Sequence, residues 1–393
     1  MLAGWSKLGQ NLGPVMLSPN PPTRDTRSLE GRLYRRSRTL LLFGCALTAM
    51  SALGCGNAED SAAPGAPVQV MTRNLYLGAD LTPLALVLDP TDIPEVAADL
   101  WDRVQASDFP GRAEVVADEI TTLQPDLVAL QEVALYRTQV PGDVLSGNLS
   151  PNATEVVLDF LDLLMTAIDQ RGGGYRVAGA AENSDAELPV ADGQGGSFDL
   201  RLTDRDVILA RDTAETSNFE VIPFSASFDL SVGGVDGLPV SFLRSTSHVD
   251  AVVGDARMVF GNSHLEVELV ASVQHQQATE LIDAYKGVSE PLLLLGDFNS
   301  KPETESYRLI TDSFDDTYPA VSDGASGYTC CQSDDLANTE STADERIDLV
   351  LSRGSWRVRS VDIIGSDREL GRTDSGLWAS DHFGVAATLE LSP

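Results

Sequence analysis

The chain has 393 residues and a formal net charge of −32, from 27 lysines and arginines against 59 aspartates and glutamates. Its 42% hydrophobic and 22% charged content is that of a globular protein and excludes a disordered one. The acidic balance argues against a protein that holds nucleic acid by neutralising phosphates. Four cysteines are too few for a disulfide scaffold. The length allows one large domain or two medium ones.

The first 54 residues are predicted to be an export signal that is not part of the fold. A basic cluster at 32–38 precedes an apolar run at 40–53, whose length of about 14 residues is short of the roughly 20 that span a bilayer. The run ends at Cys55 in a pattern that resembles a bacterial lipoprotein signal, in which the cysteine carries the lipid. A plain cleaved signal and an uncleaved anchor are the alternatives. Residues 1–30 are consistent with an overlong start-codon assignment.

Cleavage before Cys55 would leave an exported, membrane-anchored protein with a tether over 55–67 and one domain over 68–393. Seven basic and two acidic residues lie within 1–54, so the remaining chain has 20 basic and 57 acidic residues and a net charge of −37. The tether is small, polar and proline-containing. We expect the domain to be a monomer.

Beyond the tether, the hydrophobic patterns predict an α/β (α+β) domain in which strands and helices do not strictly alternate. Four consecutive leucines at 292–295 are typical of a fully buried strand. In chain order the predicted elements are strand 68–74, helices 94–107 and 111–123, strand 126–132, helix 153–169, strands 174–180, 205–211, 239–243 and 257–264, helix 270–285, strand 291–297, helix 303–312, and strands 346–352, 356–364 and 383–391. Long loops, which usually carry function, are predicted at 137–152, 181–199, 212–238 and 321–343.

Eight polar residues lie at or beside strand ends, where a buried strand would not normally place them. They are Asn74, Glu132, His264, Asp297, Asn299, Asp348, Asp381 and His382. Each has an ordinary explanation when taken alone: a carboxylate could cap a turn, His264 could be a hydrogen-bonded core histidine, and Asp348 could pair with Arg346. Because a charged group at the end of a core strand is costly unless it is paired or binds a metal, the whole set favours one shared site.

The chemistry of this set suits phosphate ester hydrolysis. Oxygen ligands from Asn74, Glu132 and Asp381 suit a hard cation such as Mg²⁺ or Ca²⁺, and the sequence has no histidine or cysteine spacing for a structural zinc. A histidine near aspartates can orient and activate water. Ester hydrolysis needs a metal, a water activator and donors to the transition state, and the set supplies all three.

The order and local sequence of these residues resemble the endonuclease/exonuclease/phosphatase (DNase I-like) superfamily. The motifs are Thr-Arg-Asn-Leu, Leu-Gln-Glu-Val, Asn-Ser-His-Leu, Gly-Asp-Phe-Asn, Arg-Ile-Asp and Ser-Asp-His, and the resemblance covers 68–391. It implies a four-layer α/β/β/α sandwich with the site at one edge of the paired sheets. Members of this superfamily include nucleases, inositol polyphosphate phosphatases and neutral sphingomyelinases.

The resemblance also implies a metal site. Glu132 would be the main ligand, with Asn74 and Asp381 completing or orienting the set. We expect Mg²⁺, with Mn²⁺ and Ca²⁺ as alternatives. Arg112 resembles a position that supports the site or the substrate, although an ordinary surface helix residue is an alternative explanation.

The remaining residues would act on the ester. Asp297 would position or deprotonate the water, while Asn299 and His264 would hold phosphate oxygens. Asp348 would pair with a histidine, and His382 would contact the phosphate or carry a proton. Which of Asp297 and His382 is the general base stays open.

We therefore expect a metal-dependent phosphoesterase. Its substrate could be a nucleic acid, a lipid head-group as in sphingomyelinases, or a small phosphate ester, and membrane anchoring modestly favours the last two. A surface binding protein without activity is the less favoured alternative. The adjacent Cys330 and Cys331 could form a disulfide or remain two buried thiols.

Overall fold

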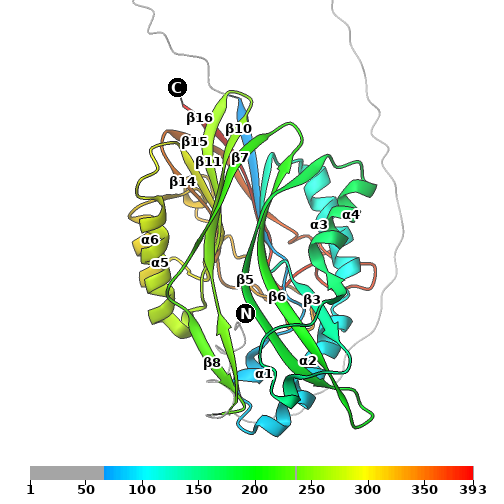
Figure 1. Ribbon diagram of the computed structural model, residues 1–393. Coiled ribbons are helices and arrows are strands. Elements are labelled where there is room, and N and C mark those ends of the chain that lie inside the picture. The colour runs from blue at the N-terminus through cyan, green and yellow to red at the C-terminus, as the bar shows by residue number, and fades with distance from the viewer. Residues whose placement is uncertain (1–65, 235–236, 393) are drawn as a thin grey trace, which may run out of the picture. The chain divides into compact units, whose positions relative to one another are not determined.

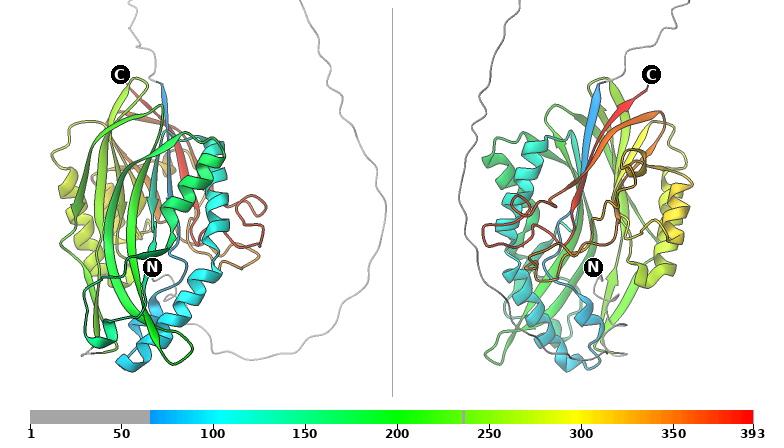
Figure 2. Two further views of the ribbon diagram at one scale, coloured as in Figure 1. Left: turned by 45° about the vertical axis from the view of Figure 1, so that its right-hand side comes forward. Right: turned by 180° about the vertical axis from the view of Figure 1, so that it is seen from behind.

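Two β-sheets pack face to face, and helices cover the outer face of each sheet (Figure 1). This computed structural model describes residues 66–234 and 237–392. The two further views in Figure 2 show both helical layers lying outside the sheets. Three separate apolar clusters fill the spaces between successive layers, so the predicted four-layer α/β/β/α sandwich is confirmed. The predicted export segment 1–54 and Cys55 lie outside the described residues.

The first sheet has eight strands in the order β15-β16-β1-β2-β6-β3-β4, with β5 pairing to β6. The strands are β1 (Pro67–Asn74), β2 (Leu127–Gln131), β3 (Leu135–Gln139), β4 (Glu155–Asp159), β5 (Tyr175–Ala191), β6 (Ser197–Arg211), β15 (Trp356–Ile364) and β16 (Gly384–Leu391). Strands β1 and β2 are parallel, while β16 runs antiparallel to β1. The carboxyl ends of β1 and β2 therefore meet the beginning of β16 at one edge.

The second sheet has six strands in the order β13-β14-β12-β11-β10-β7. They are β7 (Glu215–Pro223), β10 (Ser245–Val253), β11 (Ala256–His264), β12 (Leu292–Asp297), β13 (Asp315–Asp316) and β14 (Asp348–Arg353). Strands β11 and β12 are parallel and β14 is antiparallel to β12, which repeats the arrangement of the first sheet. A separate hairpin pairs β8 (Phe228–Val232) with β9 (Leu238–Phe242).

Helices α2, α3 and α4 cover the first sheet, and α5 and α6 cover the second. Their bounds are α1 (Thr82–Ala85), α2 (Ile93–Ala106), α3 (Phe109–Leu123), α4 (Phe160–Gln170), α5 (Ala271–Tyr285) and α6 (Glu305–Thr311). The Asp108 side chain caps α3 by accepting from the amide of Gly111, and Asp159 caps α4 by accepting from Leu161. No helix among the described residues is both long and apolar enough to cross a membrane.

The leucine run in β12 shows how one strand serves two cores. All four leucines are fully buried. Leu293 and Leu295 pack into the cluster between the sheets, while Leu292 and Leu294 pack against the helix side. Because side chains alternate across a strand, only an apolar residue at every position can satisfy both faces, and the prediction of a fully buried strand is confirmed.

The predicted helix at 153–169 was wrong in its first part. Residues 155–159 form β4, which pairs with β3, and the helix starts only at Phe160. The β-branched pair Val156 and Val157 suits an edge strand, and the carboxylate of Asp159 caps the helix that follows.

The loops predicted at 181–199 and 212–238 were also wrong. Most of 181–199 belongs to the long hairpin of β5 and β6, and 212–238 contains β7 and β8. Two register shifts interrupt the pairing of β5 with β6. Each shift reverses the face to which the following side chains of β5 point, so the sequence of β5 shows only a weak alternation of apolar and polar residues. Cross-strand pairing with β6 maintains the strand through these irregular positions.

We predict that Gly296→Ala destabilises the protein by roughly 3 kcal/mol or more. Gly296 has φ of 152°, and a Cβ there would lie 1.8 Å from the carbonyl oxygen of Ser263 on the neighbouring strand. A Cβ added at Gly287 would meet no atom within 4 Å beyond its chain neighbours, so Gly287→Ala is the matched control and should change stability by less than about 0.5 kcal/mol. Urea unfolding measures the free energy of unfolding of both variants. Equal stability of Gly296→Ala and Gly287→Ala would contradict the prediction.

Candidate active site

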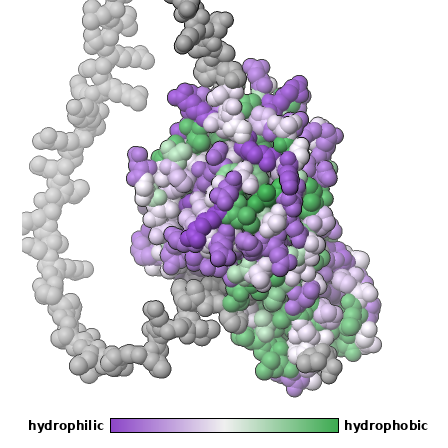
Figure 3. All heavy atoms as spheres, turned by 90° about the vertical axis from the view of Figure 1, so that its left-hand side faces the viewer, coloured by the Kyte–Doolittle hydropathy of each residue, from purple (hydrophilic) through white to green (hydrophobic). Residues whose placement is uncertain are grey.

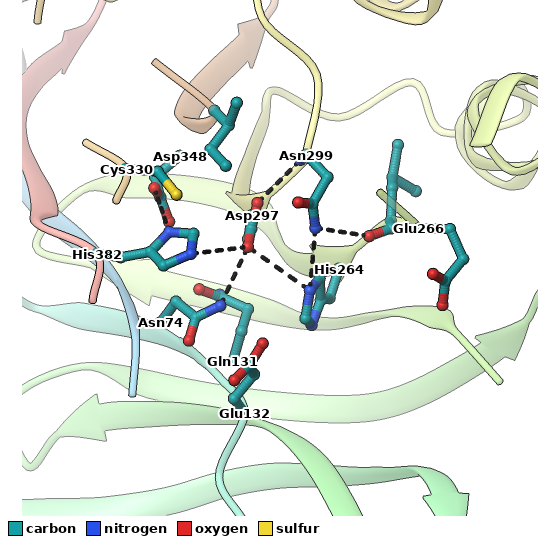
Figure 4. A network of polar contacts seen from close by, with 12 residues as sticks. Asn74, Gln131, Glu132, His264, Glu266, Asp297, Asn299, Cys330, Asp348 and His382 are labelled. Atoms are coloured by element: carbon teal, nitrogen blue, oxygen red, sulfur yellow. Dashed lines mark hydrogen bonds and ion pairs between the residues drawn. The ribbon is translucent and has the colours of Figure 1, made fainter. Parts of the chain in front are cut away.

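The predicted site residues lie at one edge of the sandwich, where strand ends from both sheets meet. Strand register places His264 beside Asp297 and Asp297 beside Asp348 in the second sheet. Asn74 ends β1 in the first sheet, and Glu132 follows β2 directly. Figure 4 shows these side chains converging from the two sheets. Glu132 and Asn299 have positive φ values of 56° and 48°, a backbone strain that is often found at functional sites.

Asp297 is the centre of the contacts. Its Oδ2 accepts a hydrogen bond of 3.0 Å from Nδ2 of Asn74 and lies 3.6 Å from Nε2 of His264 and 3.8 Å from Nε2 of His382. Its Oδ1 accepts from the amide of Asn299 at 2.9 Å. Burial, with a further contribution from the Asp348 carboxylate, raises the pKa of Asp297 to about 7, although the charge of His382 opposes this.

His382 is held as a cation by the carboxylates around it. Its Nδ1 lies 2.9 Å from Oδ2 of Asp348. Burial lowers the pKa of His382, but the carboxylates of Asp348, Asp381 and Asp297 outweigh burial and raise the pKa to about 10. The buried guanidinium of Arg73 donates to the carbonyl oxygen of His382 and so fixes its backbone.

His264 is held neutral by the opposite kind of partner. Nη1 of Arg244 lies 2.9 Å from Nδ1 of His264. A guanidinium can only donate, so Nδ1 accepts and the hydrogen of the neutral ring lies on Nε2, which faces Asp297 and Asn299. Burial and the charge of Arg244 lower the pKa of His264 well below its usual value. The two histidines therefore present a neutral donor and a cation to the same carboxylate.

Arg244 and its two carboxylate partners were not predicted from the sequence. Arg244 pairs with Glu266 at 2.8 Å and with Asp204 at 3.2 Å, and all three side chains are at most 2% exposed. Arg244 lies one residue before β10, where an arginine is usually a surface residue. The signal that could have revealed the group is Glu266, which interrupts the apolar residues Leu265 and Val267 just after His264.

Glu132, Asn74 and Asp381 are the candidates to hold a metal ion. Oε2 of Glu132 accepts from the amide of Leu77 at 2.8 Å, and Oδ1 of Asn74 accepts from the amide of Tyr76 at 2.8 Å. Burial raises the pKa of Asp381, the charge of His382 opposes this, and the negative charge of Glu132 raises the pKa further. Two buried carboxylates that repel each other are stabilised by a cation between them, and oxygen donors of this kind suit Mg²⁺. The residues therefore fit a hard cation.

A second group with metal-binding geometry overlaps the histidine cluster. Ligand atoms of Asp297, Asp348 and His382 lie within 4.8 Å of one another. Here Nδ1 of His382 and Oδ2 of Asp348 already bond to each other at 2.9 Å, and Asp297 already accepts from Asn74 and Asn299. Because these groups satisfy one another, we favour Glu132, Asn74 and Asp381 as the ligands.

Arg112 contacts the backbone of two loops that carry candidate site residues. It is fully buried, so the interpretation as a surface residue is wrong. Its guanidinium donates to the carbonyl oxygens of Leu75, Tyr76 and Ala379, in the two loops that follow Asn74 and precede Asp381. Arg112 therefore holds these loops together.

Cys330 and Cys331 lie next to the histidine cluster. The structure joins them in a disulfide, and Cys330 forms an isolated β-bridge with His382. The bridge places the segment around Cys330 against the backbone of His382.

The chain belongs to the Endonuclease/Exonuclease/phosphatase family, whose model matches residues 100–382. The match includes every candidate site residue except Asn74. The chain is similar in fold to an endonuclease/exonuclease/phosphatase family protein from Leptotrichia buccalis C-1013-b, with 15% identity and a TM-score of 0.50 over 82% of this chain and 100% of that one. A family protein from Bacteroides thetaiotaomicron has 18% identity and a TM-score of 0.51 over 84% and 99%. No curated protein matches the chain.

We predict that Arg244→Met destabilises the protein by roughly 3–5 kcal/mol, because Asp204 and Glu266 would be left as uncompensated buried charges. Arg368, whose side chain is 59% exposed in its pair with Glu340, provides the matched control. Arg368→Met should change stability by less than about 1 kcal/mol. Urea unfolding measures both variants. A loss in Arg244→Met no larger than in the control would show that the buried network contributes little.

Proposed function

We propose that the protein is a metal-dependent phosphoesterase that hydrolyses a phosphate ester with an activated water. The observation that carries this proposal is the pair of buried histidines whose Nε2 atoms both lie within 4 Å of the carboxylate of Asp297, one held at Nδ1 by Arg244 and the other by Asp348. A neutral donor, a cation and a base at one point are what attack on a phosphoryl group requires. Membership of the Endonuclease/Exonuclease/phosphatase family supports the same reaction class.

The phosphate oxygens are held by donors on both sides of Asp297. His264 donates through Nε2–H, and His382 presents a positive charge. The side-chain nitrogen of Asn299 lies 3.3 Å from Nε2 of His264 and 2.9 Å from the carbonyl oxygen of Leu265, which fixes this side chain beside the histidine. Rigid donors in a buried site stabilise the charge that develops in the transition state without reorganising.

Asp297 accepts the proton of the attacking water. The unprotonated nitrogen of His264 already accepts a hydrogen bond from Arg244, and Nδ1 of His382 already bonds to Asp348. Asp297 is then the acceptor at the centre of the group. Asp348 is a positioning residue that keeps His382 oriented and protonated, so that His382 can give a proton to the leaving oxygen.

The proposed metal is Mg²⁺, held by Glu132, Asn74 and Asp381, with Mn²⁺ and Ca²⁺ as alternatives. When bound, the ion neutralises phosphoryl oxygens as a Lewis acid. Asn74 links this set to the water site, because its Nδ2 donates to Asp297 while its Oδ1 faces the Tyr76 amide.

A nucleic acid is disfavoured as the substrate. The arginines that could have formed a phosphate track, Arg201, Arg205 and Arg211, each have an internal partner, in Asp185, Asp159 and Gln124 respectively. With a formal charge of −32 over the whole chain, long-range attraction of a polyanion is not expected. We therefore favour a lipid head-group or a small phosphate ester. Export, the lipid on Cys55 and a monomeric state remain parts of this proposal that rest on the sequence.

We predict that Asp297→Ala and His382→Ala each lower kcat on bis-p-nitrophenyl phosphate by roughly 10²–10³-fold, as expected for removal of a transition-state contact. His275 is exposed on α5, so His275→Ala is the control and should retain activity. Release of p-nitrophenolate is the measurement. Unchanged rates in Asp297→Ala and His382→Ala would place the reaction elsewhere, and absence of any metal-dependent hydrolysis by the wild type would reject the proposed function.

We predict that saturating Mg²⁺ raises the melting temperature, since an ion that binds only the folded state stabilises it by about 2.7 kcal/mol at a concentration of 100 Kd. EDTA should reverse the rise. Glu132→Gln should abolish most of the shift, whereas Glu340→Gln, at an exposed surface pair, should retain it. Thermal unfolding monitored by circular dichroism gives a readout that does not depend on activity. An equal Mg²⁺ response in both variants would exclude Glu132 as the main ligand.

A further inference from the structure

A second group of acidic residues lies on the first sheet, outside the candidate active site. Ligand atoms of Asp143, Glu187 and Asp199 lie within 4.8 Å of one another. Glu187 is on β5 and Asp199 on β6, while Asp143 is in the connection from β3 to β4, residues 140–154. The tip of the β5–β6 hairpin lies at the lower end of the molecule in Figure 1, and the face of this end that Figure 3 shows is rich in hydrophobic side chains. Three carboxylates this close repel one another and require a compensating charge.

One oxygen of each carboxylate is held by hydrogen bonds within the protein. Oδ2 of Asp199 accepts from the backbone amides of 143–144. Oε2 of Glu187 accepts from the backbone amides of 152–153, at 2.6 and 2.8 Å. Oδ2 of Asp143 accepts from two asparagine side chains of the same connection, at 3.1 and 3.0 Å. These bonds fix the orientation of all three carboxylates.

The other oxygen of each carboxylate is buried and has no hydrogen-bond partner among the described residues. These atoms are Oδ1 of Asp143, Oε1 of Glu187 and Oδ1 of Asp199, and Oδ1 of Asn152 is in the same state. Asp199 is fully buried, and its Oδ1 faces the connection, since a Cβ added at Gly142 would lie 2.5 Å from it. Buried oxygens without a partner are rare, so four of them in contacting side chains indicate a ligand.

The neighbouring arginines are engaged by another carboxylate. Arg201 lies opposite Glu187 in the register of the hairpin, but its guanidinium pairs with Asp185 at 2.5 Å. It therefore contributes charge to Glu187 at longer range, without a hydrogen bond to the free oxygen. Arg137 also lies near Asp185, at 3.9 Å. The partner of the four oxygens is therefore expected to be a cation from solution.

A calcium ion fits these oxygens. Ca²⁺ binds carboxylate and amide oxygens at about 2.3–2.6 Å, so ligands on opposite sides of the ion are about 4.6–5.2 Å apart. The spacing within 4.8 Å agrees with this. An ion at such a distance lies closer to its ligands than a hydrogen-bonded water does, at about 2.8 Å, so it needs no water-sized space beside these atoms. Mg²⁺ usually keeps several waters and suits an enclosed set of oxygens less well.

We propose that Asp143, Asn152, Glu187 and Asp199 form a calcium site that is separate from the candidate active site. Asp143, Asn152 and Glu187 are partly exposed, so a hydrated ion can reach the group from the surface. The bound ion joins the connection between β3 and β4 to both strands of the hairpin. Its role is to stabilise this end of the fold, and the inference does not depend on the proposed function.

The first test measures Ca²⁺ binding by isothermal titration calorimetry in the Glu132→Gln protein, which lacks the main proposed ligand of the active-site metal. This protein should still bind one Ca²⁺ ion. Adding Glu187→Gln should weaken binding at least about tenfold, because the number of charged ligands sets the affinity. Glu182 is exposed on the same strand, so adding Glu182→Gln is the matched control and should leave the affinity unchanged. Absence of binding in Glu132→Gln, or equal affinities in the two double variants, would overturn the proposal.

The second test separates a metal ligand from a side chain that only forms hydrogen bonds. Saturating Ca²⁺ should raise the melting temperature of Glu132→Gln by at least about 3 °C relative to EDTA. Adding Asp199→Asn or Glu187→Gln should remove most of this rise. With EDTA the same changes should cost less, because each also relieves repulsion among the carboxylates. A loss of equal size with Ca²⁺ and with EDTA would show that these residues act only through their hydrogen bonds, and would overturn the calcium site.

The third test locates the ion without any substitution. The backbone amides of 143–144 and 152–153 donate to two of the proposed ligands, so Ca²⁺ should slow their hydrogen exchange. Mass spectrometry of peptides from the 140–154 connection measures this, and peptides from α5 serve as the internal control. Slower exchange in the connection and not in α5 supports the site. Exchange in the connection that is the same with Ca²⁺ and with EDTA would overturn it.

Discussion

The hydrogen bond between Asn74 and Asp297 is the constraint on which the site depends, because it joins the last residue of β1 in one sheet to the last residue of β12 in the other. A deeper amide contact, from Gln131 to Asn262, joins the sheets in the same way at 2.7 Å. Apolar packing between sheets is not directional, whereas these buried polar links are satisfied in one register only. The relative position of the two sheets, and with it the spacing of the metal ligands and the phosphate donors, is therefore fixed at the edge where the chemistry is proposed.

The two histidines show how the partner of a buried imidazole shifts its pKa up in one case and down in the other. His382 faces the carboxylate of Asp348, and His264 faces the guanidinium of Arg244. Since a carboxylate accepts and a guanidinium donates, the partner sets both the protonation state and the ring nitrogen that carries the hydrogen. Asp297 lies between the two rings. The positive charge of His382 compensates the Asp297 carboxylate on one side, and the neutral ring of His264 adds no second positive charge on the other.

The position of the site could be predicted because a charged residue at the end of a buried strand is rare enough to be noticed, whereas the four-layer arrangement was expected only from the family resemblance. Asp297 after four leucines is the clearest case, and its register partners His264 and Asp348 were found by the same rule. Arg244 could not be found, since its burial depends on Asp204 and Glu266, which are brought to it only by the fold. The full length of the β5–β6 hairpin was missed for a related reason. Its two strands are stabilised by pairing with each other, whereas the local hydrophobic pattern of their sequences is weak.

The acidity of the chain and the internal pairing of its cations bear on the proposed substrate in the same direction. A polyanion would meet net repulsion, whereas a single phosphodiester has one charge, and the local cation at His382 can compensate it. The described lysine that follows the Asp297 motif, Lys301, is already engaged by Glu268 and Glu345, so it offers little to a second phosphate. For the proposed lipid head-group or small phosphate ester, binding energy beyond the phosphate would then come from an uncharged part of the substrate.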